Sequence, residues 1–256
     1  ELSENMKSHI YRIAKNKLSL LIFLIMIFIP CIDIVLLLLT NTNYDPTFAF
    51  FLSGASRGHA AQMILLWFLP LYLLLLCADD PIQDYKTGFY QVLVSKVGRK
   101  KYCTEKIMTS FLISFSTMCV SLFINFIMVH ILFFNGTFKN DLEQIKFPDN
   151  LLYTFSMSHP YYAILLFSIV CCMLAGLIGA LGAGVSLLFR DKKYAYPACF
   201  FIWFLLVLKK KSLVYLFQPF TEYGLDVLLP ILITSVSIFF ILIFIIIIYQ
   251  VKYNEN

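Results

Sequence analysis

The stretch Leu18–Leu39 reads LSLLIFLIMIFIPCIDIVLLLL, and its single formal charge is Asp33. A helix of this length extends about 33 Å at about 1.5 Å per residue, which is enough to cross the hydrocarbon core of a bilayer. A surface helix of a soluble protein would carry a polar face, and this stretch has none. The stretch therefore predicts a membrane-spanning helix.

Five further runs have the same character: 60–78, 107–134, 161–189, 195–208 and 227–249. None of the five contains Asp, Glu, Lys or Arg, although charged residues make up 14% of the 256-residue chain. Strands that cross a bilayer alternate in polarity, and these runs do not. The sequence predicts one domain, residues 1–256, an all-α polytopic membrane protein with six transmembrane helices at 18–39 and at these five runs. Because 195–208 is short, a re-entrant fifth element is an alternative.

Basic residues are distributed unevenly over the polar segments between the runs. Alternate segments carry 14 Lys and Arg on one side and 6 on the other. The positive-inside rule then predicts both termini in the cytoplasm, with 79–106 and 190–194 also inside. The cluster 209–211 is discordant, since the same count places its three lysines outside. The first run is too long for the apolar part of a cleavable signal peptide, so we expect it to stay as a span.

The segment 1–17 has apolar residues at helical spacing, with basic residues on the other faces: Leu2, Met6, Ile10 and Ile13 against Lys7, Arg12 and Lys15. This pattern is typical of an amphipathic helix that lies in the membrane interface. We expect it to lie along the inner surface and to contact anionic lipids through its basic residues.

The segment 79–101 reads DDPIQDYKTGFYQVLVSKVGRKK. Proline is suited to the first turn of a helix, and an aspartate before it can cap that helix. One face of a helix from Pro81 to Val97 would be apolar: Ile82, Tyr85, Phe89, Val92 and Leu93. An apolar helix face in a cytosolic loop needs a partner, although lipid contact is the simpler alternative.

This pattern resembles the permease subunits of ABC exporters, in the ABC-two-type superfamily that contains the ABCG and O-antigen transporters. In that family an acidic residue, a small residue plus Gly, a short Leu-rich stretch and an Arg before a Lys-ended helix form the element that docks on the ATPase. The matching residues, in order, are Asp84, Thr87-Gly88, Leu93, Arg99 and Lys106. Val97-Gly98 stands where the family usually has a proline before the Arg. The resemblance covers the architecture of nearly the whole chain but only about 25 residues as a motif.

The resemblance implies a cytoplasmic coupling helix within 80–100, with these ATPase-coupling residues: Asp84, Tyr85, Thr87, Gly88, Phe89, Tyr90, Leu93 and Arg99. It implies a dimer, more simply a homodimer, paired with two cytosolic ATPase subunits that bind ATP and magnesium. It further implies export of hydrophobic or amphipathic substrates, such as phenol-soluble-modulin or bacteriocin-like peptides, across a bacterial plasma membrane. None of the ten glycines is followed by Lys, so the chain lacks a phosphate-binding GxxxxGK[ST] loop. We therefore expect no ATPase site, no cofactor in this chain, membrane lipids as neighbours and no nucleic-acid partner.

Three polar residues within the apolar runs are candidates for a translocation path: Asp33, Asn125 and His130. Interhelical hydrogen bonding is the alternative for each of them. With Asp33 and His130 as titrating groups, a proton-coupled secondary transporter is a second hypothesis, and a multidrug or lipid exporter is another.

A stripe of small residues marks the fourth run: Gly176, Gly179, Ala180, Ala183 and Gly184. Small residues at this spacing let helix backbones approach closely. The default partner is a helix of the same chain, and a subunit interface or a hinge are the alternatives.

The pentapeptide 54–58 spells G-x-S-x-G and is followed by His59. In a hydrolase this serine needs a strand-to-helix turn and an acid partner, so a membrane-embedded serine hydrolase is a remote alternative. Six of the seven cysteines lie in apolar runs and no CxxC pair occurs, so we expect neither an extracellular disulfide nor a metal site.

Overall fold

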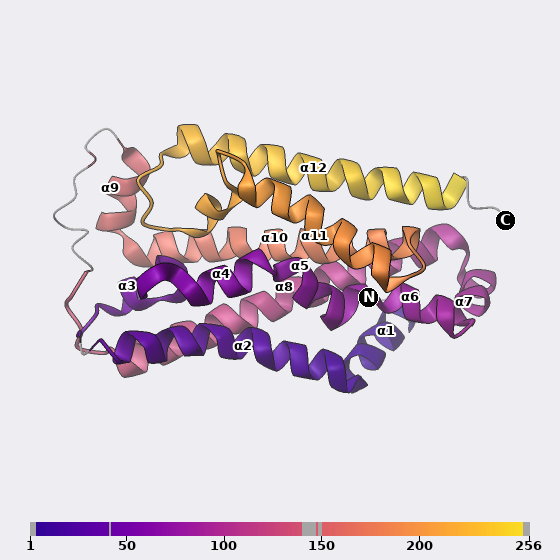
Figure 1. Ribbon diagram of the computed structural model, residues 1–256, viewed down its shortest axis with the longest axis horizontal. Coiled ribbons are helices and arrows are strands. Elements are labelled where there is room, and N and C mark those ends of the chain that lie inside the picture. Colours follow the sequence, from indigo (N-terminus) through magenta and orange to yellow (C-terminus); the bar gives the residue numbers. More distant parts are fainter. Residues whose placement is uncertain (1–3, 41, 140–146, 148–149, 253–256) are drawn as a thin grey trace.

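The computed structural model describes residues 4–40, 42–139, 147 and 150–252. The described chain is a bundle of helices, with one isolated β-bridge between Tyr44 and Phe138. Figure 1 shows that the long helices run side by side along the longest axis of the molecule. Helices α1 (Glu4–Lys15), α6 (Asp80–Lys86) and α7 (Phe89–Val97) lie toward one end, where α12 (Leu225–Lys252) also finishes. We call this the coupling end, and the opposite end, which carries α9 (Leu151–Ser158), the distal end.

Four helices are long and apolar enough to cross a membrane: α2 (Lys17–Leu38), α8 (Arg99–Leu132), α10 (Pro160–Leu188) and α12. They confirm the predictions at 18–39, 107–134, 161–189 and 227–249, and α8 begins eight residues earlier than its apolar run. The second run is bent by 54° between α4 (Ala60–Trp67) and the segment 69–78, and it counts as a fifth span if the two parts are taken together. The protein is therefore an all-α polytopic membrane protein with four to five candidate spans.

The predicted count of six exceeds this number by one because of the run at 195–208. It forms α11 (Lys192–Leu208), whose 17 residues reach only about 25 Å. Beyond α11, the short helix η4 (Leu213–Phe217) buries Leu213, Leu216 and Phe217 in the bundle core.

The remaining short elements lie on either side of the second run. Three of them precede it: α3 (Pro46–Ala49), η1 (Phe51–Ser53) and η2 (Arg57–His59). The second part of the run consists of α5 (Leu69–Leu73) and one π-helical segment, η3 (Leu74–Ala78). The π-helical turn delivers the chain directly to Asp79 and α6.

The bend in the second run follows from Pro70. A proline inside a helix cannot donate to the carbonyl four residues earlier, which here belongs to Leu66. The indole Nε1 of Trp203 on α11 donates to that carbonyl at 3.0 Å. A side chain from another helix thus replaces the lost bond, and the bend is stabilised by tertiary packing.

Pro30 has the same effect in α2. It leaves the carbonyl of Met26 without its intrahelical donor, and Ser121 Oγ of α8 donates to this carbonyl at 2.7 Å. Asn125, one turn further along α8, donates from Nδ2 to the Pro30 carbonyl at 3.0 Å and accepts from the Phe51 backbone N–H at 3.0 Å. Helices α2 and α8 are therefore joined by hydrogen bonds at the proline.

Helix α10 is the centre of the bundle and packs most extensively against α8. Its small residues face neighbouring helices of the same chain: Gly179 lies against Ser114 of α8, Gly182 against Leu74 of η3, and Gly184 against Ile246 of α12. Ala180 and Ala183 are buried in the same core. Within the described residues, the stripe thus serves packing inside one chain.

Replacing Gly179 and Gly184 with alanine distinguishes a tight helix contact, at Gly179, from a looser one, at Gly184. A Cβ at position 179 would lie 2.0 Å from Ser114 Oγ and 2.9 Å from the Ser110 carbonyl, whereas at position 184 the nearest atom lies at 3.4 Å. We expect Gly179→Ala to lower the free energy of unfolding by about 1–3 kcal/mol through overpacking, and Gly184→Ala to leave it unchanged or raised. Thermal unfolding in a mild detergent measures both, and equal Tm values for the two variants would contradict the close packing of α8 on α10.

Candidate functional site

The segment between the second and third runs forms an elbow of two helices. Helix α6 ends at Lys86, Gly88 adopts a left-handed backbone with φ of 72°, and α7 begins at Phe89. The single helix predicted from Pro81 to Val97 is therefore wrong. Glycine adopts this backbone conformation at little cost, so Gly88 sets the turn.

The two arms of the elbow have opposite environments. Ile82 and Asp84 of α6 are completely buried, whereas α7 contains no buried residue. Phe89 and Val92 of α7 are 42% and 58% exposed. The apolar face predicted for one helix is thus divided: Ile82 belongs to the core, and Phe89 and Val92 form an exposed apolar surface on α7.

A buried ionic cluster lies behind the elbow. The ammonium of Lys106 on α8 is 2% exposed, pairs with Asp80 and lies 2.6 Å from Asp84 Oδ2. The guanidinium of Arg12 on α1 bridges the same two aspartates, at 3.0 Å from Asp80 Oδ1 and 2.7 Å from Asp84 Oδ1. Two carboxylates and two cations thus join α1, α6 and α8.

Two further partners complete the ionic cluster. Tyr102 of α8 donates its hydroxyl to Asp84 Oδ2 at 2.9 Å. His9 of α1 is buried, and its Nδ1 lies 2.8 Å from Lys106 Nζ. His9, Asp80 and Asp84 present donor atoms close enough to hold a metal ion. However, the Lys106 ammonium contacts all three residues, so the cation at this position is supplied by the chain itself.

The ionic cluster shifts the protonation equilibria of its members outside the spans. Burial favours the neutral form of the Asp80 carboxyl, but contact with His9 and the charges of Lys106 and Arg12 outweigh it, so the pKa of Asp80 lies well below its ordinary value. Burial also lowers the pKa of Arg12, and the charges of Asp80 and Asp84 more than compensate, so that this pKa is raised. Both residues are therefore charged at neutral pH.

A second ion pair holds the base of α6 against α11. Lys192 Nζ pairs with Asp79, and Tyr196 donates its hydroxyl to Asp79 Oδ2 at 2.9 Å. Gln83 donates to Asp79 Oδ1 at 3.2 Å. Asp79 precedes α6, but its side chain makes no capping bond, so the prediction that it caps this helix is wrong. Asp80, the alternative cap, lies within α6 and is paired in the ionic cluster.

Aromatic side chains fill the inside of the elbow. Tyr85 and Tyr90 have ring centroids 4.9 Å apart, and Tyr90 packs edge-on against Tyr102 at 5.3 Å. Burial raises the pKa of Tyr90 despite the opposing charge of Arg99 nearby. The guanidinium of Arg190, at the start of the turn before α11, lies 4.1 Å from the Tyr85 ring centroid.

The residues predicted to contact an ATPase thus occupy three positions. Asp84 is buried in the ionic cluster, and Tyr85, Tyr90, Leu93 and Arg99 are only partly exposed around the turn. The exposed members are Thr87, Gly88 and Phe89.

Sequence patterns missed most of the ionic cluster. Helix α1 was predicted to turn Arg12 toward lipid headgroups, and the structure instead places Arg12 and His9 against α6. Leu2, assigned to the apolar face, lies outside the described residues. One signal was present: Asp80 and Asp84 are spaced i, i+4 and so share one helix face, where two like charges need a cationic partner.

The path candidates at the distal end lie in different surroundings. Asn125 is fully buried, and the hydrogen bonds at Pro30 occupy its amide. Asp33 is also buried and faces Ser56 and His59, which brings an acid to the G-x-S-x-G motif. Ser56 is only 3% exposed, and the motif lies between short helical turns instead of a strand and a helix. This is not the arrangement that a hydrolase nucleophile requires.

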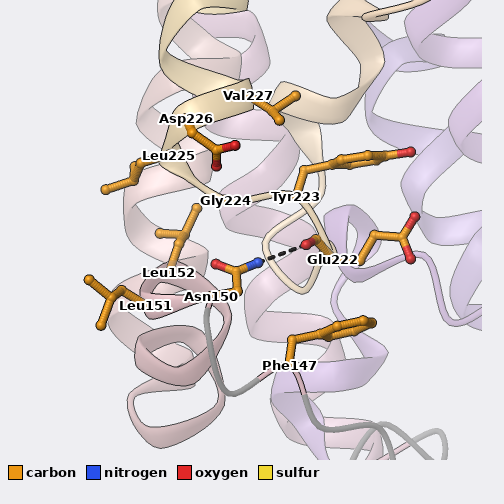
Figure 2. A pocket seen from close by; sticks show the side chains of 10 residues that line it. All are labelled: Phe147, Asn150, Leu151, Leu152, Glu222, Tyr223, Gly224, Leu225, Asp226 and Val227. Atoms are coloured by element: carbon orange, nitrogen blue, oxygen red, sulfur yellow. Dashed lines mark hydrogen bonds between the residues drawn. The ribbon is translucent and has the colours of Figure 1, made fainter.

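A surface pocket of about 510 Å³ lies at the distal end, between the starts of α9 and α12. Figure 2 shows the Asn150 amide directed at the backbone of Glu222, with the rings of Phe147 and Tyr223 on either side. Asn150 Nδ2 donates to the Glu222 carbonyl at 2.7 Å, and its Oδ1 accepts from the Tyr153 N–H at 3.1 Å, which caps α9. Among the described residues, the lining includes the carboxylates of Glu222 and Asp226 and no basic side chain.

Comparison with known proteins found one close relative in Bacillus subtilis (strain 168), described as uncharacterized protein YybM. The two sequences are 71% identical over 251 residues, which cover 98% of this chain and 100% of YybM. No family model matches the chain, and no solved structure does.

Removing the central cation tests the ionic cluster. Lys106→Met keeps the side-chain length but leaves two buried carboxylates facing Arg12 alone, and breaking a buried pair in this way costs about 3–5 kcal/mol. Lys86→Met is the matched control, because Lys86 forms an exposed pair with Asp191 at 3.7 Å, and exposed pairs contribute less than about 1 kcal/mol. Thermal unfolding in detergent should show a large loss for Lys106→Met only, and equal losses would contradict the buried arrangement.

The depressed pKa of Asp80 predicts a pH dependence of stability. A carboxyl whose folded-state pKa lies below its unfolded value of about 3.9 stabilises the folded state above that pH and loses this contribution as the pH falls. We expect Asp80→Asn to be less stable than the wild type at pH 7, and the difference to shrink as the pH is lowered from about 5 to about 3. Chemical unfolding in detergent at several pH values measures it, and a difference that grows on acidification would contradict the assignment.

Proposed function

We infer that this chain, which belongs to the same family as YybM of Bacillus subtilis, is the membrane subunit of an ATP-driven exporter. The observation that carries this proposal is the exposed apolar surface of α7, on an elbow outside the spans and tied to them by buried charges. In this proposal, a cytosolic ATPase binds α7.

The exposed position of Phe89 and Val92 supports a protein partner. Helix α7 lies at the extreme coupling end of the bundle (Figure 1), beyond the apolar parts of the neighbouring spans. It also carries exposed Lys96, and Lys100 follows at the start of α8. Apolar side chains surrounded by polar residues are typical of a protein contact.

The ionic cluster supports transmission of movement from α7 into the membrane. Helix α6 is tied to α1 through Arg12, to α8 through Lys106 and to α11 through Asp79. Buried charges separate only at a high cost, so these helices move with α6. A displacement of the elbow would thus reach three membrane-associated helices without passing through a flexible loop.

The proposed assembly contains two copies of this chain and two ATPase subunits, which supply the ATP and magnesium sites. Each chain contributes six crossings, with Tyr194 and the lysines that flank α11 covering by snorkelling the thickness that this short helix does not span, and both termini face the cytoplasm of a bacterial cell. Since Asp33 is the single formal charge in the apolar runs, the proposed substrate is hydrophobic or amphipathic, and a peptide is the first choice.

Charge introduced on α7 tests the docking surface. We expect Val92→Asp to lower both binding of the ATPase and stimulation of its ATP hydrolysis by at least about tenfold, a loss equivalent to about 1.4 kcal/mol. Gln91→Asp is the matched control, because Gln91 is an exposed polar residue of the same helix and the substitution adds the same charge without removing apolar surface. The chain is co-expressed with each ATPase of the same genome that has a phosphate-binding loop and no transmembrane helix. Co-purification and ATP hydrolysis are then measured.

Two results would overturn the proposal. One is a Val92→Asp variant that retains wild-type binding and ATP hydrolysis. The other is transport in reconstituted vesicles that continues when the partner ATPase is inactivated and follows a proton gradient instead.

A further inference from the structure

A groove of about 410 Å³ opens between α8 and α10 in the distal half of the bundle. Its floor is apolar and buried, and includes Phe50, Leu122 and Ile164. Its rim is apolar and exposed, and includes Phe123 and Ile169. Because both helices are candidate spans, the groove opens toward the hydrocarbon of the bilayer.

The lining selects an uncharged hydrocarbon ligand. None of its twelve residues is charged, and its polar groups are the hydroxyls of Ser168 and Tyr161 and the thiols of Cys119 and Cys172. Water in such a groove would find few hydrogen-bond partners, so an apolar occupant is favoured.

The dimensions of the groove fit a single hydrocarbon chain and are too small for an α-helix. Along α8 the lining extends from Phe115 to Phe126, which is about 16 Å at about 1.5 Å per residue. The volume divided by this length gives a mean cross-section of about 25 Å², whereas an α-helix about 10 Å wide needs roughly 80 Å². A transmembrane helix of a second subunit would therefore not fit inside the groove.

His130 lies beside the distal end of the groove, behind two of its lining rings. His130 packs its ring against two lining rings, at centroid distances of 4.1 Å from Phe126 and 5.7 Å from Tyr161. Its Nδ1 lies 2.8 Å from the Phe126 carbonyl, which can only accept, so Nδ1 carries the proton. In the neutral imidazole Nε2 is the acceptor, and it is buried without a hydrogen-bond partner among the described residues.

We propose that this groove binds one acyl chain of a membrane phospholipid, with the headgroup at the Tyr161 end and a headgroup hydroxyl or ammonium donating to His130 Nε2. The chain fills the space that α8 and α10 leave open above their close contact at Gly179. This site is separate from the elbow and does not depend on the proposed exporter function.

Photo-crosslinking of the purified chain in lipid nanodiscs tests the site. The probe is a phosphatidylglycerol with a diazirine in the middle of one acyl chain, and mass spectrometry maps the adducts. We expect adducts concentrated on the groove, on Cys119, Phe123, Ser168 and Ile169. Ser168→Trp, which fills the groove, should lower them at least fivefold. Ile241→Trp, on an exposed part of α12, is the control and should not change them.

A second comparison tests the headgroup contact without filling the groove. Phosphatidylcholine has no O–H or N–H donor in its headgroup, so its diazirine analogue should label the groove several-fold less than the phosphatidylglycerol probe, and His130→Phe should remove this difference. Uniform labelling of α2, α10 and α12 that Ser168→Trp does not change would overturn the proposal. So would Cys119 crosslinks between two copies in place of lipid adducts, since a second chain would then cover the groove.

Discussion

The arrangement of the coupling end depends on the contacts of the Lys106 ammonium, which is enclosed by Asp80, Asp84 and His9. Lysine is almost never fully buried unless it is paired. Here Lys106 directly precedes the apolar run that begins at Ile107 of α8, and it is 2% exposed, so little water solvates it. The aspartates replace that water, and they are in turn neutralised by Arg12. If α1 or α6 separated from α8, at least one charge of the cluster would lose its partner, which is costly at a buried position.

Such a cluster contributes more to specificity than to net stability. Replacing a buried ion pair with well-packed apolar residues is often neutral or stabilising, whereas removing one member is costly. Its physical effect is to select one arrangement, since only one register of α6 brings both Asp80 and Asp84 to Lys106 and Arg12. The elbow at Gly88 then has a defined direction, and Phe89 and Val92 of α7 remain exposed while Tyr90 and Leu93 pack against the bundle.

The sequence predicts the spans well because their signal is local. Apolar runs without charge specify α2, α8, α10 and α12 regardless of the rest of the chain. The elbow was mispredicted because the helical spacing of Tyr85, Phe89 and Val92 continues across Gly88, although glycine can end one helix and turn the chain before the next. The ionic cluster was missed because its partners are far apart along the chain: Lys106 and Asp80 are separated by 26 residues, and Lys106 and His9 by 97. Amphipathicity of α1 predicted a surface helix, and a local pattern of this kind does not distinguish a basic face on lipid from one on buried aspartates.

In the proposed exporter the elbow must move although buried charges hold it firmly, and the second run offers a bend at which it can do so. The part nearer the coupling end, from Leu69 through the π-helical turn to α6, is tied to three helices by the buried charges. The part nearer the distal end, α4, is separated from this first part by the bend before Pro70. At that bend the helix lacks its own bond to the Leu66 carbonyl and relies on Trp203 of α11. In the proposed exporter, a displacement of α6 would be taken up at this bend. Helix α11 contacts both sides of it, because Trp203 donates to the Leu66 carbonyl of α4 and Tyr196 donates to Asp79. In that proposal, the proline and the buried charges together divide the second run into one part that follows the elbow and one that stays with the distal end.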